Sequence, residues 1–112
     1  MRKYRDTAYI EILIPGGQEG QAEARMADAF GWVSPRSRRS RCVAAFPADL
    51  PGGDQQMTLA VKLPLLARWN STRLHAVIGE VLGQLDEAGI GYRLIEVEVG
   101  DLVYLPKDVA SG

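Results

Sequence analysis

Arginine is the residue type whose spacing first suggests chemistry in this chain. The 112 residues carry 13 Lys and Arg against 14 Asp and Glu, a formal net charge of -1 at pH 7. An Arg/Ser-rich stretch at 34–41 contains Arg36, Arg38, Arg39 and Arg41. Guanidinium groups pair with phosphate or carboxylate through parallel hydrogen bonds. The stretch therefore predicts an anion-binding segment, and a solvated loop is its alternative.

Nucleophilic and metal-binding residue types are scarce. His75 is the single histidine and the candidate for a general acid or base, a role that requires a partner to set its tautomer and pKa. Cys42 alternates with Ala44 and Phe46, which predicts a buried, unreactive thiol. We expect no metal site and no cofactor, because one histidine and one cysteine give no recognisable ligand spacing. A lone cysteine also excludes an internal disulfide, so we expect a cytoplasmic protein.

A glycine-rich turn at 16–20 lies between an expected strand and an expected helix, where backbone amides can hold a phosphate. Pro15 stands where the first glycine of a dinucleotide-binding fingerprint belongs, and Glu19 would repel an anion. We therefore interpret this segment as a plain turn between two elements.

Hydrophobic periodicity predicts four main strands and two helices. The strands are expected at Ala8–Ile14, Cys42–Phe46, Met57–Leu63 and Tyr92–Val99. The helices are expected at Gln18–Phe30 and Ser71–Ala88. A short edge strand is expected at Leu102–Leu105.

The resulting order, β-α-β-β-α-β, resembles the ferredoxin-like sandwich over nearly the whole chain. The resemblance implies an α+β fold of two layers, with an antiparallel sheet in the strand order 4-1-3-2 and both helices on one face. It implies no function, because this fold hosts many unrelated ones. We expect residues 1–106 to form this single domain and residues 107–112 to form a frayed tail.

The core is expected between the sheet and the helices. Its expected members are Ile10, Ile12, Ile14, Leu59, Val61, Val97 and the stripe Leu74–Leu85. The second helix is expected to begin after Asn70 or Ser71 and to end at Gly89 or Gly91, because these residue types cap helices.

The sheet face away from the helices carries apolar and acidic side chains. Tyr9, Leu13 and Leu94 are expected on it, which predicts a homodimer packed sheet to sheet. A solvated face with scattered apolar groups is the alternative. Three glutamates are expected on the same face: Glu11, Glu96 and Glu98. Their charges would repel a phosphate backbone, so nucleic acid is not expected to bind the sheet.

Connectivity brings the arginine-rich loop, the chain start and the start of the second helix to one end of the sandwich, which we call the basic end. The second helix adds its positive N-terminus there, and two tryptophans offer stacking surfaces for bases. The expected anion-binding residues of the basic end are Arg36, Arg38, Arg39, Arg41, Arg68, Arg73, Trp32 and Trp69. Closing the core is the alternative role of the tryptophans.

These features predict a non-catalytic binding or accessory module, a homo-oligomer whose basic end engages an anionic partner. A nucleic acid, a phosphorylated ligand and an acidic protein surface all fit that end. Two alternatives are a small dimeric enzyme with His75 as acid or base, and a structural assembly subunit that uses the apolar sheet face and a helix groove at Gly79 and Gly83. No membrane partner is expected, because the apolar runs are too short to span a bilayer.

Overall fold

The computed structural model describes residues 6–16, 19–31, 41–64 and 70–107. Its elements follow in the order β1 (Thr7–Ile14), α1 (Glu19–Ala29), β2 (Cys42–Asp49), β3 (Gln55–Lys62), α2 (Ser71–Glu87), β4 (Arg93–Val99) and β5 (Leu102–Tyr104). Every strand pairing is antiparallel, so the protein is a small α+β structure with one five-stranded sheet and two helices. No helix among the described residues is long and apolar enough to cross a membrane.

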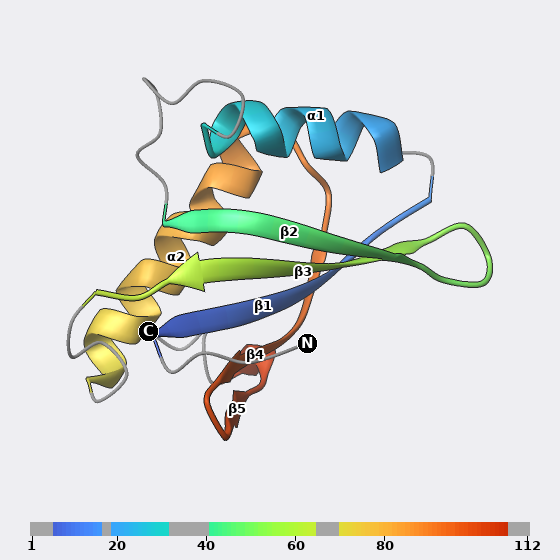
Figure 1. Ribbon diagram of the computed structural model, residues 1–112. Coiled ribbons are helices and arrows are strands. Elements are labelled where there is room, and N and C mark those ends of the chain that lie inside the picture. Colours follow the sequence, from blue (N-terminus) through green and yellow to red (C-terminus); the bar gives the residue numbers. More distant parts are fainter. Residues whose placement is uncertain (1–5, 17–18, 32–40, 65–69, 108–112) are drawn as a thin grey trace.

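The sheet has the strand order β2-β3-β1-β4-β5 (Figure 1). β1 lies in the middle between β3 and β4, which is the adjacency expected for the four main strands. The short strand expected after them forms as β5 and pairs with β4. β2 is longer than its sequence suggests and ends at Asp49. The two edges of the sheet are therefore β2 and β5.

The core lies between one face of the sheet and the two helices. On β1, Ala8, Ile10, Ile12 and Ile14 are all 0% exposed. The helices cover them with Ala22 and Met26 of α1 and with Leu74, Val77, Ile78, Val81 and Leu85 of α2. Each isoleucine buried in this way contributes about 1.5–3 kcal/mol relative to exposure. One cluster contains the side chains of both helices and the sheet, which confirms the expected core.

The ends of α2 form as the sequence predicts. Asn70 Oδ1 accepts a hydrogen bond from the Arg73 amide at 3.2 Å and so satisfies one of the free amides at the helix start. At the other end Gly89 adopts a φ of 72°, a left-handed conformation that suits glycine. The Ile90 amide donates to the Leu85 carbonyl at 3.1 Å, and both side chains are buried, as in a Schellman motif.

A β-bulge in β2 corrects one expectation from the sequence. Cys42 and Ala44 both have partners on β3, and Val43 is the extra residue between them. Cys42 faces the core and is 1% exposed, as expected, but Ala44 and Phe46 lie on the opposite face of the sheet. The expected alternation is wrong beyond Val43, because one inserted residue reverses the side of every residue that follows it.

A second irregularity lies between β1 and β4. Glu11 pairs with Glu96, but the next residue, Ile12, pairs with Leu94, so Ile95 is the extra residue. Leu94 therefore shares the helix side of the sheet with Ile12 and packs against the core. Its expected place on the opposite face is wrong, because the bulge reverses the alternation toward the start of β4.

The turn after β1 is held by the loop of the β2–β3 hairpin. The Gly16 amide donates to Asp54 Oδ1 at 2.9 Å, so this amide is already engaged and does not face a phosphate. A Cβ atom on Gly16 would lie 2.9 Å from the Gly53 carbonyl oxygen, closer than real side chains approach. Gly16 therefore serves the close contact of a plain turn, while residues 17–18 of the glycine-rich segment lie outside the described residues.

Gly16→Ala is expected to lower the free energy of unfolding by about 1–3 kcal/mol, because its methyl group meets backbone atoms rather than a movable side chain. Gly79→Ala is the matched control, since nothing lies within 4 Å of a Cβ atom at this exposed helix position. The control should raise stability by about 0.5–1 kcal/mol through helix propensity. Urea denaturation measures both variants, and equal effects of the two substitutions would contradict the close contact at Gly16.

Burial raises the pKa of the Cys42 thiol to about 12. At pH 8 the native protein then holds a thiolate fraction about a thousandfold smaller than that of an ordinary cysteine. We expect Cys42 to react slowly with Ellman's reagent in the native protein and rapidly in urea. A native reaction rate equal to the rate in urea would show that this thiol is accessible and that the core around β2 is open.

Candidate functional site

The described part of the basic end holds three exposed cations, Arg41, Lys62 and Arg73. The Lys62 amide at the end of β3 donates to the Arg41 carbonyl just before β2 at 2.8 Å, so these two residues are neighbours. Arg73 lies in the first turn of α2, which begins at the same end of the sandwich (Figure 1). No acidic side chain lies in that turn, so α2 itself does not offset the positive charge of its N-terminus.

The remaining anion-binding candidates lie outside the described residues. Trp32, Arg36, Arg38 and Arg39 fall within 32–40, and Arg68 and Trp69 fall within 65–69. The first stretch leads directly to Arg41, and the second leads directly to the cap of α2 at Asn70. Arg41 and Arg73 are therefore the two candidates that the structure places, and both are exposed.

Acidic side chains of the β2–β3 hairpin lie at the opposite end of the sheet. Asp49 ends β2 and Asp54 precedes β3, so both are separated from the basic end by the length of the hairpin. Two acids also lie at the basic end. The Asp6 carboxylate accepts a hydrogen bond from the Thr7 hydroxyl at 3.3 Å. Asp101 is exposed in the turn between β4 and β5, next to the pair of Val99 with Ala8. The described charges are thus unevenly distributed along the strands, which favours approach of an anion from the basic end.

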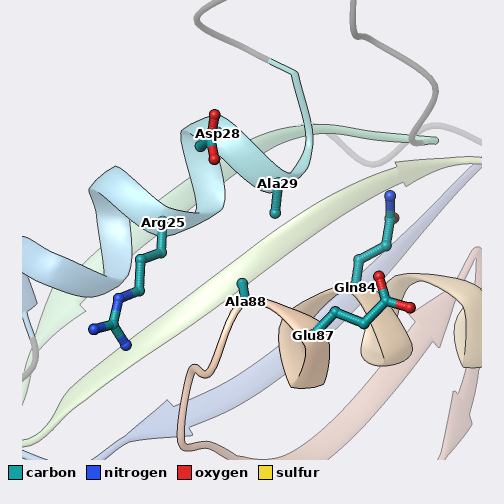
Figure 2. Close-up of a pocket in the computed structure, with 6 residues that line it drawn as sticks. All are labelled: Arg25, Asp28, Ala29, Gln84, Glu87 and Ala88. Atoms are coloured by element: carbon teal, nitrogen blue, oxygen red, sulfur yellow. The ribbon is translucent and has the colours of Figure 1, made fainter.

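A cleft of about 290 Å³ lies between the two helices (Figure 2). Its lining residues are Arg25, Asp28, Ala29, Gln84, Glu87 and Ala88. Arg25 Nη1 donates to the Gly89 carbonyl at 3.1 Å, so the guanidinium joins α1 to the end of α2. Asp28 and Glu87 are exposed at the surface of the cleft. The arrangement explains how the helices are held together.

The sheet face away from the helices, which we call the open face, offers a different set of apolar groups from the expected one. Tyr9 lies on it but is only 4% exposed, and Leu94 lies on the other face. Leu13 is half-buried there. Phe46 is 46% exposed on the open face, and it escaped sequence reasoning because simple alternation placed it in the core. Val103 of β5, the cross-strand partner of Glu98, is 53% exposed on the same face, so Leu13, Phe46 and Val103 are apolar groups available for contact there.

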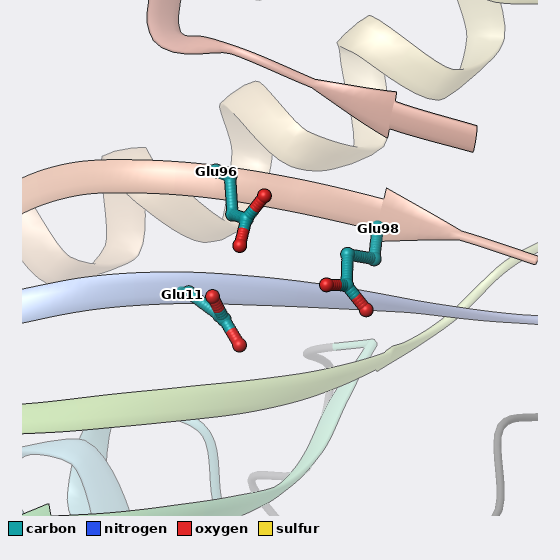
Figure 3. A group of neighbouring side chains, drawn as sticks. All are labelled: Glu11, Glu96 and Glu98. Atoms are coloured by element: carbon teal, nitrogen blue, oxygen red, sulfur yellow. The ribbon is translucent and has the colours of Figure 1, made fainter. Parts of the chain in front are cut away.

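Three glutamates come together on the open face (Figure 3). Glu11 of β1 and Glu96 of β4 are cross-strand partners, and Glu98 follows two residues later on β4. Each side chain is half-buried, and ligand atoms of the three lie within 4.8 Å of one another. Carboxylate oxygens are the ligands that Mg²⁺ and Ca²⁺ prefer, so these residues can hold a metal. Acidic groups of this kind are also common without an ion.

The acidic group was readable from the sequence only in part. The spacing of Glu96 and Glu98 puts both on one face of a strand, and Glu11 was expected on that same face. What the sequence lacks is the pairing register that sets Glu11 opposite Glu96. Like charges at this distance reinforce one another's field. The open face is therefore unfavourable for a phosphate backbone, and the expected absence of a metal site stays a prediction.

His75 packs against the edge strand β5. Its ring centroid lies 6.5 Å from that of Tyr104, with the ring planes at 90°. Edge-to-face contacts of this kind stabilise the packing of two elements, here α2 and β5. A general base instead needs a hydrogen-bonding partner that fixes its tautomer. The observed ring contact thus gives His75 a packing role, and an acid or base role stays a prediction.

Comparison with known proteins gives no match to a family model, to a curated protein or to a solved structure. Function must therefore be argued from the residues of this chain. The basic end, the acidic open face and the buried thiol are the features that carry that argument.

Proposed function

We propose that this chain is a non-catalytic binding module whose basic end engages an anionic partner. The observation that carries this proposal is the exposure of Arg41, Lys62 and Arg73 at one end of the sandwich, beside the start of α2. Positive groups gathered at one place raise the local concentration of anions and speed their association. The arginine-rich stretch at 34–41 leads directly to Arg41 in the sequence, and its residues 34–40 lie outside the described residues.

The partner we favour is a phosphate backbone. Arginine forms paired hydrogen bonds with phosphate oxygens, whereas lysine acts as a point charge. The acidic group Glu11, Glu96 and Glu98 directs such a partner away from the open face and toward the basic end. A single phosphorylated ligand or an acidic protein surface would use the same arginines, and failure to bind duplex DNA at low salt would indicate one of these instead.

We also propose that the fold is a ferredoxin-like sandwich with an added edge strand. Support comes from the antiparallel order β2-β3-β1-β4, from the position of α1 after β1 and α2 after β3, and from the single cluster that both helices share with the sheet. β5 extends the sheet beyond β4. A lone buried cysteine supports a reducing, cytoplasmic setting.

The wild-type protein is expected to bind duplex DNA with an affinity that falls steeply as salt rises from about 50 to about 200 mM, because each phosphate contact releases condensed counterions. Replacing Arg38 and Arg41 together with alanine should flatten the slope of log affinity against log salt by about two units, since each lost contact removes about 0.9. Fluorescence anisotropy of a labelled duplex measures the slope.

The charge-matched control is Arg25→Ala combined with Arg93→Ala, two exposed cations at the opposite end of the sandwich. Arg25 bonds the Gly89 carbonyl after the end of α2, and Arg93 pairs with Leu13 near the end of β1. It removes the same net charge and should leave the slope close to that of the wild type. Absence of binding at low salt would overturn the choice of a phosphate backbone. An equal flattening in both double variants would show that only net charge matters.

The exposed apolar side chains of the open face favour self-association as a second function. Phe46 is 46% exposed, although aromatic side chains are usually more buried, and Leu13 lies on the same face. The free edge of β2 is less suitable than the open face for binding a second copy, because a strand added there would lack a hydrogen-bond donor. The Leu50 amide donates to the Asp54 carbonyl, so by alternation the nitrogen of Pro47 faces the free edge. Proline lacks the amide that an added strand would need there.

If the open face forms a sheet-to-sheet homodimer, light scattering should give twice the chain mass, and Leu13→Glu or Phe46→Glu should reduce it to one chain. Each substitution buries an unpaired charge in the interface. Ala76→Glu, on an exposed position of α2, is the control and should leave the mass unchanged. A wild-type protein that stays monomeric at high micromolar concentration would rule out the homodimer.

A further inference from the structure

The sheet edge at β5 lacks the features that protect the edge at β2. β5 is the last strand in the order β2-β3-β1-β4-β5, and no strand of the described residues pairs with its outer side (Figure 1). The opposite edge, β2, carries a bulge at Val43 and a proline at Pro47, and both discourage the addition of a strand. Within β5, Leu102–Tyr104, there is neither a proline nor a break in the register with β4. β5 is therefore the edge at which this sheet can accept a further strand.

The hydrogen bonds of the sheet determine which way the backbone of β4 faces. The Leu63 amide after β3 donates to the Asp6 carbonyl before β1 at 2.8 Å, so the backbone of Asp6 faces β3. Because this direction alternates from residue to residue, the backbone of Tyr9 faces β4, where Tyr9 pairs with Glu98. The amide and carbonyl of Glu98 are consequently turned toward β1 and away from β5.

The same alternation fixes the direction of the backbone in β5. Glu98 is the cross-strand partner of Val103. Since the backbone of Glu98 faces β1, that of Val103 faces away from β4, while the flanking residues Leu102 and Tyr104 bond to β4. Val103 thus presents one N–H and one C=O at the free edge. A single residue of an antiparallel strand would engage both groups.

The side chains along this edge are apolar and exposed. Leu102, Val103 and the next apolar residue, Leu105, are 55%, 53% and 46% exposed. They are three of the five large hydrophobic side chains exposed in the described part of the chain, so exposure is concentrated here. Scattered apolar side chains on a surface are ordinary, but a run of them along an unpaired sheet edge indicates a surface that binds a partner.

Charge on the open face selects the chemistry of that partner. Val103 lies beside Glu98, and Glu96 and Glu11 complete the acidic group there (Figure 3). A residue placed opposite Val103 on an added strand would share this face. A lysine or arginine there can lay its aliphatic stem over Val103 and extend its charge toward the glutamates. The residues on either side of it would face the helix side, next to the exposed Leu102, and apolar side chains suit that position.

We propose that β5 binds an extended segment of a partner protein as an added antiparallel strand, and that this segment alternates basic and apolar residues. Its backbone bonds to Val103, its basic side chains extend toward Glu98, and its apolar side chains contact Leu102. Main-chain bonds of this kind supply affinity, and the alternate side chains supply specificity. The partner is basic and binds a sheet edge, so the proposal rests neither on the anionic partner of the basic end nor on the homodimer of the open face.

A capped heptapeptide of alternating lysine and valine is the probe, and fluorescence anisotropy of its labelled form measures affinity. The same peptide with glutamate in place of lysine should bind about tenfold or more weakly, because its charge is repelled by the glutamates of the open face. In an amide NMR titration, the lysine peptide should shift the Val103 signal saturably, with the largest shifts in β5. Equal affinities of the two peptides, or unshifted β5 signals, would overturn the proposal.

Two N-methylated forms of the lysine peptide test the backbone contact without altering the protein. In the proposed antiparallel strand, the lysine opposite Val103 turns its amide toward β5, and the valine amides face away. Methylating the lysine amides should weaken binding about tenfold or more, because it removes the donors and places methyl groups in the ladder. Methylating the valine amides should leave the affinity almost unchanged. Equal effects of the two modifications would contradict an added strand.

Two pairs of protein variants locate the contacts. Val103→Pro removes the outward amide and should weaken the lysine peptide about tenfold, whereas Val103→Thr keeps the amide and should not. Glu98→Gln should weaken it about two- to fourfold, and Glu80→Gln, at an exposed position of α2, should leave it unchanged. Amide spectra check that each variant is folded. A Val103→Pro affinity equal to that of the wild type would overturn the proposal. So would a doubled mass in Phe46→Glu that Val103→Pro abolishes, because a second copy would then occupy β5.

Discussion

Burial of one side of β1 is the constraint on which the other features of the structure depend. Ala8, Ile10, Ile12 and Ile14 are fully buried beneath both helices, and β1 lies in the middle of the sheet. A slip of one residue in its pairing would expose all three isoleucines, so the register with β3 and β4 is strongly fixed. That register determines which residues of β3 and β4 share the open face with Glu11.

Two bulges then decide what the open face presents. The bulge at Val43 turns Phe46 out of the core and onto the open face. The bulge at Ile95 turns Leu94 into the core and leaves Glu96 and Glu98 beside Glu11. The face is consequently apolar near β2, acidic between β1 and β4, and apolar again at Val103 of β5. A partner that covers it must accept both apolar and acidic parts. The described basic end is mainly positive, with Arg41, Lys62 and Arg73 against Asp6 and Asp101.

Sequence reasoning recovered the features that depend on local chemistry. Periodicity predicted the elements and the core, and residue type predicted the caps of α2 at Asn70 and Gly89. It failed at the bulges, because an inserted residue leaves the composition of a strand unchanged while reversing its faces. It also missed the bond between Gly16 and Asp54, which joins residues 38 positions apart.

The separation of charge between the basic end and the open face is the central claim, and an amide NMR titration with inorganic tripolyphosphate tests it most directly. Residues near the bound anion shift most, because the anion changes their local field. The predicted result is a set of shifts centred on Arg41, Lys62 and Arg73. Shifts centred on Glu11 and Glu96, or no shifts at the basic end, would contradict it.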